Sequence, residues 1–169
     1  QLFGIPGIPA PPEPREEWFC LTRLRVSDAL LSDESADELD RASTDLPYTE
    51  VKTEAAIDRV TSAATPRSME RVPAGAVFAP LRISLFRYED DSPALLDRLV
   101  EGMELLEADY LGGSGSRGSG RVSFQNFQIE ELSLPAEGRG EVRRFEGALP
   151  DLAALRSAVN DVRHWMTGG

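Results

Sequence analysis

The residues best suited to binding chemistry form a loop at residues 112–120, which reads GGSGSRGSG and has glycine at five of its nine positions. Glycine lacks a Cβ atom, so this backbone can approach a ligand closely, although ordering it is costly in conformational entropy. Successive N–H groups in such a loop can converge into a concave anion site. The loop therefore predicts a cradle for a polyanion, and RNA is the favoured ligand.

Side chains of the same segment would add donors for phosphate oxygens, because the serines carry hydroxyls and arginine carries a planar fork of N–H groups. The predicted RNA contacts are Gly112, Gly113, Ser114, Gly115, Ser116, Arg117 and Gly118, followed by Arg121.

Three other interpretations of this loop are a dinucleotide-binding turn, a Walker A loop and a flexible linker. Residues 113–118 match G-x-G-x-x-G, but in dinucleotide-binding turns that pattern follows a strand and opens a helix. Here it follows an expected helix and precedes an expected strand, which excludes NAD and FAD. A Walker A loop is excluded because no Gly-Lys-Ser/Thr follows. A flexible Gly/Ser linker is the remaining alternative, and Arg117 between the glycines disfavours it.

At first sight the net charge of the chain opposes an RNA ligand. The net charge is −11, whereas neutralised phosphates supply much of the affinity for nucleic acid. The acid is unevenly distributed, however: it gathers at residues 33–45 and 89–91, and residues 112–128 contain none. Only Lys52 is a lysine, so arginine supplies nearly all of the positive charge. That choice suits phosphate recognition, although a genome-wide compositional bias would produce it too.

A second candidate region covers residues 50–75, where β-branched and charged residues alternate and prolines interrupt the run. This pattern predicts an extended arm or hairpin that contacts something else. Its carboxylates could hold a metal or orient the attacking 2′-hydroxyl in RNA cleavage, or they could simply pair with arginines. The candidate RNA contacts are Lys52, Arg59, Arg67 and Arg71, and the accessory catalytic candidates are Glu50, Glu54, Asp58 and Glu70.

Several other kinds of site are excluded by residue counts. One cysteine, Cys20, and one histidine, His164, allow neither an internal disulfide nor a structural zinc set. His164 falls on the polar face of an expected helix, which favours a solvated residue over a general base. No apolar run approaches the roughly 20 residues that span a bilayer, so we expect no membrane contact and a cytoplasmic location.

The hydrophobic pattern predicts an α+β domain with an antiparallel or mixed sheet. Residues 1–14 are expected to form a loop, and residues 32–49 an exposed acidic excursion. Residues 19–26 are expected to form a strand with Leu24 and Val26 inward and Arg23 and Arg25 outward. Two helices are expected: one is capped by Ser92 and ends near Asp109, and the other spans residues 152–165 before Gly168. Further strands are expected at residues 77–86 and 122–129, the second with a bulge near Asn126.

Two long strings in this sequence identify a family resemblance. They are LGGSGSRGSGRVSF at residues 111–124 and YTEVKTEAAIDRVTSAATPRSMERVPAGAVF at residues 48–78, and the opening LFG at residues 2–4 fits the same family. Together they resemble the RAMP-superfamily backbone subunit of type III-A CRISPR (Csm) effector complexes. The resemblance runs from the start of the chain to about Leu132.

This resemblance implies a ferredoxin-like, RRM-related core with an inserted thumb-like hairpin. It implies one RAMP-like domain over residues 1–169, an insertion at residues 30–78, and a glycine-rich RNA-binding loop at residues 111–121. Family members polymerise along a CRISPR guide RNA, beside neighbouring copies or fused RAMP domains, and they cut the paired target RNA. Cleavage would need Mg²⁺ or another divalent metal, whereas RNA binding would need no cofactor.

Two departures from the family pattern bear on activity. Ser119 stands where the family usually has an aromatic residue. The family's catalytic aspartate precedes the LFG motif, whereas this sequence begins at Gln1, so we expect the aspartate and the first part of the core to lie outside this chain, in a fused segment or a separate polypeptide. Two hypotheses follow: an RNA-guided endoribonuclease subunit, or a non-catalytic structural module that binds guide RNA.

Overall fold

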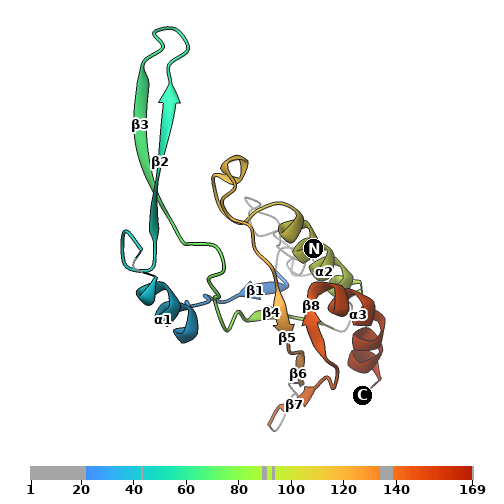
Figure 1. Ribbon diagram of the computed structural model, residues 1–169. Coiled ribbons are helices and arrows are strands. Elements are labelled where there is room, and N and C mark those ends of the chain that lie inside the picture. Colours follow the sequence, from blue (N-terminus) through green and yellow to red (C-terminus); the bar gives the residue numbers. More distant parts are fainter. Residues whose placement is uncertain (1–21, 43, 89–90, 93, 134–138, 169) are drawn as a thin grey trace. The chain divides into compact units, whose positions relative to one another are not determined.

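The computed structural model describes residues 22–42, 44–88, 91–92, 94–133 and 139–168. The expected loop at residues 1–14 and Cys20 lie outside these ranges. The chain divides into two compact units. We call residues 25–84 the hairpin unit, and residues 85–169 with the segment up to residue 24 the helical unit. Figure 1 shows an α+β protein with small antiparallel sheets and, in the described residues, three α-helices.

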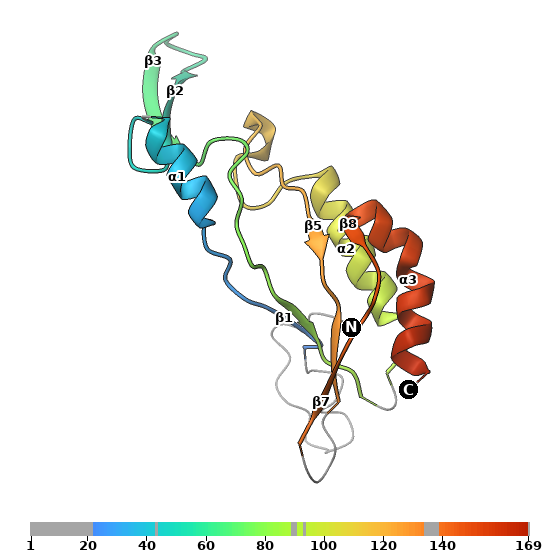
Figure 2. The same ribbon diagram turned by 60° about the horizontal axis from the view of Figure 1, so that its bottom comes forward.

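The helical unit is built on α2 (Leu95–Ala108) and α3 (Leu152–Thr167), which lie side by side in Figures 1 and 2. Strand β5 (Gln125–Phe127) pairs antiparallel with β8 (Leu149–Asp151), which leads directly into α3. Asp151 caps α3 by accepting from the Ala154 N–H at 2.8 Å. The buried apolar side chains of this unit are Val100, Met103, Leu149, Leu152, Leu155, Val159 and Val162.

A second antiparallel pair in the helical unit joins β6 (Glu130–Ser133) to β7 (Glu141–Arg144). None of the helices in the described residues has the length and apolar content that crossing a membrane would need.

The hairpin unit contains α1 (Asp33–Arg41) and a long hairpin of β2 (Glu50–Ile57) and β3 (Ala64–Arg71), drawn in Figure 1. The chain enters this unit through β1 (Leu24–Val26) and leaves it through β4 (Ile83–Leu85), and these two strands pair with each other. The expected hairpin is therefore present, with an antiparallel register that places Glu50 opposite Arg71.

Residues 32–49, expected to form an exposed acidic excursion, are mostly exposed, but residues 33–41 form a helix that was not predicted. Ser32 caps α1, its Oγ accepting from the Ser35 N–H at 3.2 Å. Acidic residues in the first turn and Arg41 in the last turn also suit the helix dipole. Leu39 is buried. The acidic residues that predicted an excursion therefore also stabilise the start of a helix.

The prediction that Arg23 faces outward was wrong. Arg23 is 8% exposed, whereas Val26 on the face expected to be buried is 55% exposed. The guanidinium of Arg23 donates to both carboxylate oxygens of Asp91, at 2.8 and 3.1 Å, and lies 4.5 Å from the centre of the Tyr88 ring. Burial is compatible with this charge because the two ions are paired with good geometry.

Burial of Asp91 would by itself raise the pKa of its carboxyl group. Hydrogen bonds from Arg23 and from the Tyr88 N–H outweigh it, so the pKa lies below its ordinary value.

Two expected strands are shorter than predicted. In residues 77–86 only Ile83–Leu85 form a strand, and Phe78 makes an isolated bridge to Leu31. Pro80 accounts for this, since it has no N–H for a ladder. After the loop, pairing starts at Gln125 rather than at residue 122. The shifted phase expected near Asn126 has a local cause, because that residue has a left-handed φ of 57°.

The two expected helices are present with small changes at their ends. Helix α2 begins at Leu95 after Ala94, not at Ser92, although the Ser92 Oγ accepts from the Ala94 N–H at 3.2 Å. Helix α3 begins at Leu152 and ends at Thr167, with Gly168 as its C-cap as predicted, and His164 is exposed. The sequence patterns did not reveal β7 and β8, which are only four and three residues long.

Candidate nucleic-acid interface

The glycine-rich loop between α2 and β5 has a defined fold. The Leu111 N–H donates to the Gly120 carbonyl at 2.8 Å and closes the loop. Inside it, a short 3-10 turn at Gly115–Arg117 is held by bonds from the Arg117 N–H to the Ser114 carbonyl and from the Gly118 N–H to the Gly115 carbonyl, both at 2.9 Å. These bonds disfavour the linker alternative, because a flexible linker would have no closing contacts of its own.

Two of the glycines are needed for the loop to close. Gly120 has a φ of +85°, and a Cβ there would lie 2.3 Å from the Leu111 carbonyl oxygen. A Cβ on Gly115 would lie 2.0 Å from the Tyr110 ring. Gly113 meets neither restriction, since its φ is not left-handed and the space beside it is open. Glycine is therefore required at defined points of this loop, and the open space at Gly113 leaves its backbone accessible to a ligand.

Helix α2 anchors both ends of the loop. Tyr110, just after the helix, lies against Gly115, and the Oε1 of Glu107 in its last turn accepts from the Phe124 N–H at 2.6 Å. The strand that follows is thus fastened to the helix that precedes the loop. Such anchoring reduces the entropy that a ligand would otherwise have to remove when it binds.

The structure brings the predicted contacts of residues 112–118 together on this one loop, and Arg121 follows three residues later. Gly112, Gly113 and residues 116–118 are exposed, whereas Ser114 and Gly115 are half-buried. The amides of Arg117, Gly118 and Ser119 donate to carbonyls within the loop. A cradle here would therefore rely on the exposed backbone at residues 112–113 and on side chains, more than on a ring of converging amides.

The predicted arm is the β2–β3 hairpin, and its carboxylates contact groups on the hairpin itself. The Arg71 Nε donates to the Glu50 Oε1 at 2.5 Å, the Lys52 Nζ lies 3.6 Å from the Glu54 Oε1, and the Thr49 hydroxyl donates to Glu70 at 2.7 Å. Among the described residues, no three His, Cys, Asp or Glu side chains come together to hold a metal.

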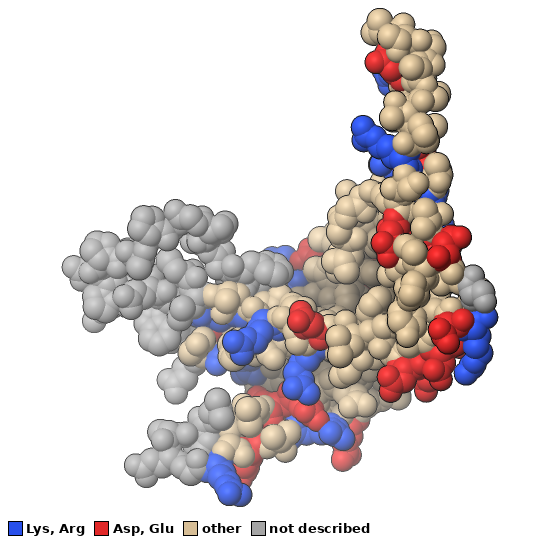
Figure 3. Space-filling model, turned by 90° about the vertical axis from the view of Figure 1, so that its left-hand side faces the viewer, with Lys and Arg blue, Asp and Glu red and all other residues tan. Residues whose placement is uncertain are grey.

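Asp58 shapes the turn of the hairpin. Its Oδ1 accepts from the Val60 and Thr61 N–H groups at 2.7 and 2.9 Å. Both bonds lower the pKa of Asp58 below its ordinary value, and the bond from the Thr61 N–H has the larger effect. The predicted contacts Arg59 and Arg67 are exposed. Figure 3 shows basic and acidic side chains along the protruding hairpin, and further acidic side chains gathered below it.

Comparison of the sequence with known proteins identifies relatives of this chain. No family model matches the chain. It is 44% identical over 107 residues to a protein of Methanothermobacter thermautotrophicus called "CRISPR system Cms endoribonuclease Csm3", a match of 63% of this chain and 42% of the relative. Proteins with the same name from Streptococcus thermophilus and Methanocaldococcus jannaschii are 42% and 38% identical, over 68% and 83% of this chain and 51% and 55% of theirs. The chain is homologous to the Csm3 proteins.

This homology confirms the family resemblance that the loop and the arm predicted. The chain spans about half the length of the Csm3 relatives that it matches.

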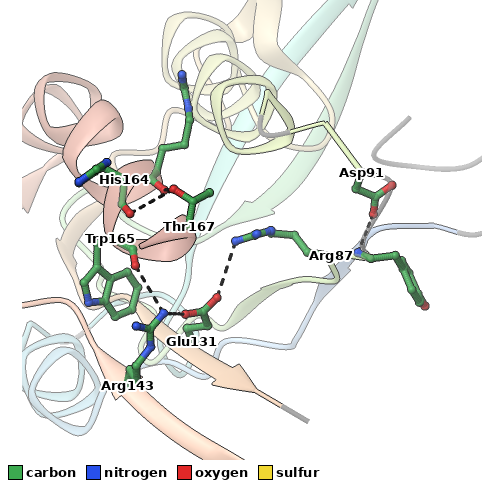
Figure 4. Close-up of polar contacts among 9 residues, drawn as sticks. Arg87, Asp91, Glu131, Arg143, His164, Trp165 and Thr167 are labelled. Carbon is green, nitrogen blue, oxygen red and sulfur yellow. Dashed lines mark hydrogen bonds and ion pairs between the residues drawn. The ribbon is translucent and has the colours of Figure 1, made fainter. Parts of the chain in front are cut away.

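Sequence reasoning missed two residues that support the loop in this Csm3 homologue, and one that joins β7 to α3. Tyr110 and Glu107 carry no motif of their own, although both immediately precede the loop. Arg143 was missed too. It donates to Glu131 and, at 3.4 Å, to the Trp165 carbonyl, and its guanidinium lies 5.2 Å from the centre of the Trp165 ring (Figure 4). Arg87 also lies 3.7 Å from Glu131. The contacts of Arg143 with Trp165 fasten the β6–β7 pair to α3.

Proposed function

We propose that this chain belongs to a Csm3-type backbone subunit that binds CRISPR guide RNA and takes part in RNA-guided cleavage of target RNA in antiviral defence. The observation that carries the proposal is 38–44% identity to proteins named as Csm3 endoribonucleases. The exposed, closed loop and the long hairpin support it. The implied partners are guide RNA, target RNA, and neighbouring copies or fused RAMP domains, in the cytoplasm.

In this proposal the core is ferredoxin-like and each candidate region has its own role. The loop at residues 111–121 grips the guide backbone through its exposed glycines, with Arg117 and Arg121 supplying charge. The β2–β3 hairpin acts as a thumb, and its basic residues contact phosphate. Those residues are Lys52, Arg59, Arg67 and Arg71.

Cleavage in this family implies a divalent metal such as Mg²⁺. The described residues do not fit one, because no three potential ligands come together and Glu50, Glu54 and Glu70 contact hairpin residues instead. We therefore assign no cleavage step to these residues, and their role in the proposal is to bind and position RNA.

The experiment uses the full polypeptide that carries these residues, loaded with a labelled guide RNA. We expect tight guide binding that weakens as salt rises, and cleavage of a complementary target when Mg²⁺ is added. Absence of guide binding at low salt would overturn the proposal. Tight binding with an uncut target would instead support the structural RNA-binding module.

A further inference from the structure

The arginines of this protein differ in whether a carboxylate accompanies them. With 29 acidic and 18 basic residues, most arginines have an acidic neighbour to pair with. Ion pairs are made by Arg23, Arg41, Arg71, Arg87, Arg98, Arg143, Arg144, Arg156 and Arg163. Arg25 and Arg82 are exposed, and across the described residues no carboxylate lies in ion-pair range of either.

The pairing of β1 with β4 brings these two arginines together. The Ser27 N–H donates to the Arg82 carbonyl at 2.9 Å, and the Phe86 N–H donates to the Arg23 carbonyl at 2.8 Å. These bonds fix an antiparallel register in which Arg25 and Arg82 occupy diagonal positions on one face of the strand pair. Diagonal neighbours lie about 7–8 Å apart, so one strand of a polyanion could contact both guanidinium groups.

A surface hollow of about 280 Å³ adjoins Arg82. Leu30 and Pro80 give it an apolar side, and Leu30 is 75% exposed. Asp28 also lines the hollow but makes no ion pair with Arg82 in the described structure. An apolar side next to a guanidinium suits a nucleotide, which presents a base or sugar next to its phosphate. A free anion would use only the charge.

We propose that Arg25 and Arg82 form a phosphate-binding surface for RNA on the β1–β4 strand pair, in addition to the loop and the hairpin. The inference rests on the proposed function, since it adds a contact for the same ligand. An arginine with no local carboxylate can bind phosphate without first breaking an ion pair, and its fork donates to two phosphate oxygens at once.

The test measures guide-RNA binding by the full polypeptide at several salt concentrations, for the wild type and for Arg25→Ala with Arg82→Ala. We expect a loss of affinity of about tenfold or more at moderate salt. The slope of log K against log salt should become shallower by about 1.4, because each phosphate contact to a single strand contributes about 0.7. Arg25→Lys with Arg82→Lys keeps the charge and should keep the slope.

The matched control is Arg41→Ala with Arg98→Ala, which removes the same charge from two exposed arginines that already pair with Asp37 and Glu101. This control should bind almost as the wild type does. The inference is overturned if the Arg25 and Arg82 double variant keeps the wild-type affinity and slope for both guide and target RNA, or loses no more affinity for either RNA than the control does. Failure of the wild type to bind guide RNA would instead refute the proposed function.

Guide and target RNA present the same phosphate chemistry, so a second arm measures target binding to the guide-loaded protein. If the guide is the ligand, the alanine pair weakens guide loading. If the target is the ligand, guide loading is unchanged and target binding weakens with the same change of slope.

Discussion

The two units of this protein are stabilised in different ways. In the helical unit, seven apolar side chains are buried between and beside α2 and α3, whereas Leu39 is the one buried apolar side chain described in the hairpin unit. The hairpin is held by its backbone ladder and by exposed contacts such as Arg71 with Glu50. Side-chain packing thus gives the helical unit much of its stability, while the hairpin unit leaves much of its side-chain surface exposed.

The largest expected effect tests this contrast directly. Leu155→Ala removes a side chain that is only 3% exposed in the core and should lower the free energy of unfolding by about 3 kcal/mol. Ile57→Ala on the hairpin, where the side chain is 67% exposed, should change it by less than about 0.5 kcal/mol. Urea denaturation measures both. Equal losses would contradict the difference between the units.

The second largest effect is expected at the buried ion pair of the helical unit, between Arg23 and Asp91. Asp91→Asn removes the charge that pairs with buried Arg23 and should cost about 2 kcal/mol. Because the pKa of Asp91 is lowered by folding, the unfolded state binds more protons in acid. The contribution of Asp91 is therefore complete above its unfolded pKa near 4 and is lost as pH falls through its folded pKa.

Urea denaturation between pH 3 and 7 checks that prediction. The wild type should lose more stability than Asp91→Asn as the pH falls below about 4. The exposed pair on the hairpin gives the comparison, since Glu50→Gln should cost less than about 1 kcal/mol. Parallel pH profiles for the wild type and Asp91→Asn would show that this carboxylate does not carry the effect.

The loop should respond to substitution at its closing glycine. Gly120→Ala forces a side chain into a left-handed backbone 2.3 Å from the Leu111 carbonyl oxygen and should weaken guide-RNA binding about tenfold, because about 1–2 kcal/mol of strain opposes the bound geometry. Gly102→Ala lies in α2 outside the loop, has open space beside it and is the matched control. Fluorescence anisotropy with labelled guide distinguishes them. A control as weak as the test variant would show that the loss does not come from the closure of the loop.

Tyr110 gives the smallest expected effect. Tyr110→Ala removes the ring that lies against Gly115 and should weaken guide binding a few fold, through the added cost of ordering the loop. Tyr110→Phe keeps the ring and should bind as the wild type does. The salt slope of Tyr110→Ala should be unchanged, because no phosphate contact is removed. A shallower slope would indicate that Tyr110 affects the phosphate contacts themselves.

Local pattern predicted the elements whose signals lie within a few residues. The apolar stripe of α3, the cap at Gly168 and the hairpin each depend on residues that lie close together in the sequence. Sequence reasoning failed where distant residues decide the outcome. Arg23 is buried because Asp91, sixty-eight residues away in the sequence, pairs with it. The residues near Arg23 give no indication of that partner. Helix α1 was not predicted, because acidic residues such as those in its first turn favour solvent exposure as well as the start of a helix.

The candidate site shows the same division. The loop was visible from its glycines, and the hairpin from its β-branched residues and prolines. The roles of Tyr110 and Glu107 were not visible, since a ring against a glycine and a carboxylate on a backbone amide both depend on how α2 and the following strand lie. Arg25 could be distinguished from the ion-paired arginines of the described residues only in the structure, because counts of charged residues do not show which charges pair across strands.

The central claim is that the glycine-rich loop grips guide RNA. The most direct test combines Arg117→Ala with Gly118→Val in the full polypeptide and measures guide affinity across a salt titration, with circular dichroism to show that the fold is retained. We predict binding weakened by about tenfold or more and a slope shallower by about 0.7. A folded variant with unchanged affinity at every salt concentration would contradict the claim.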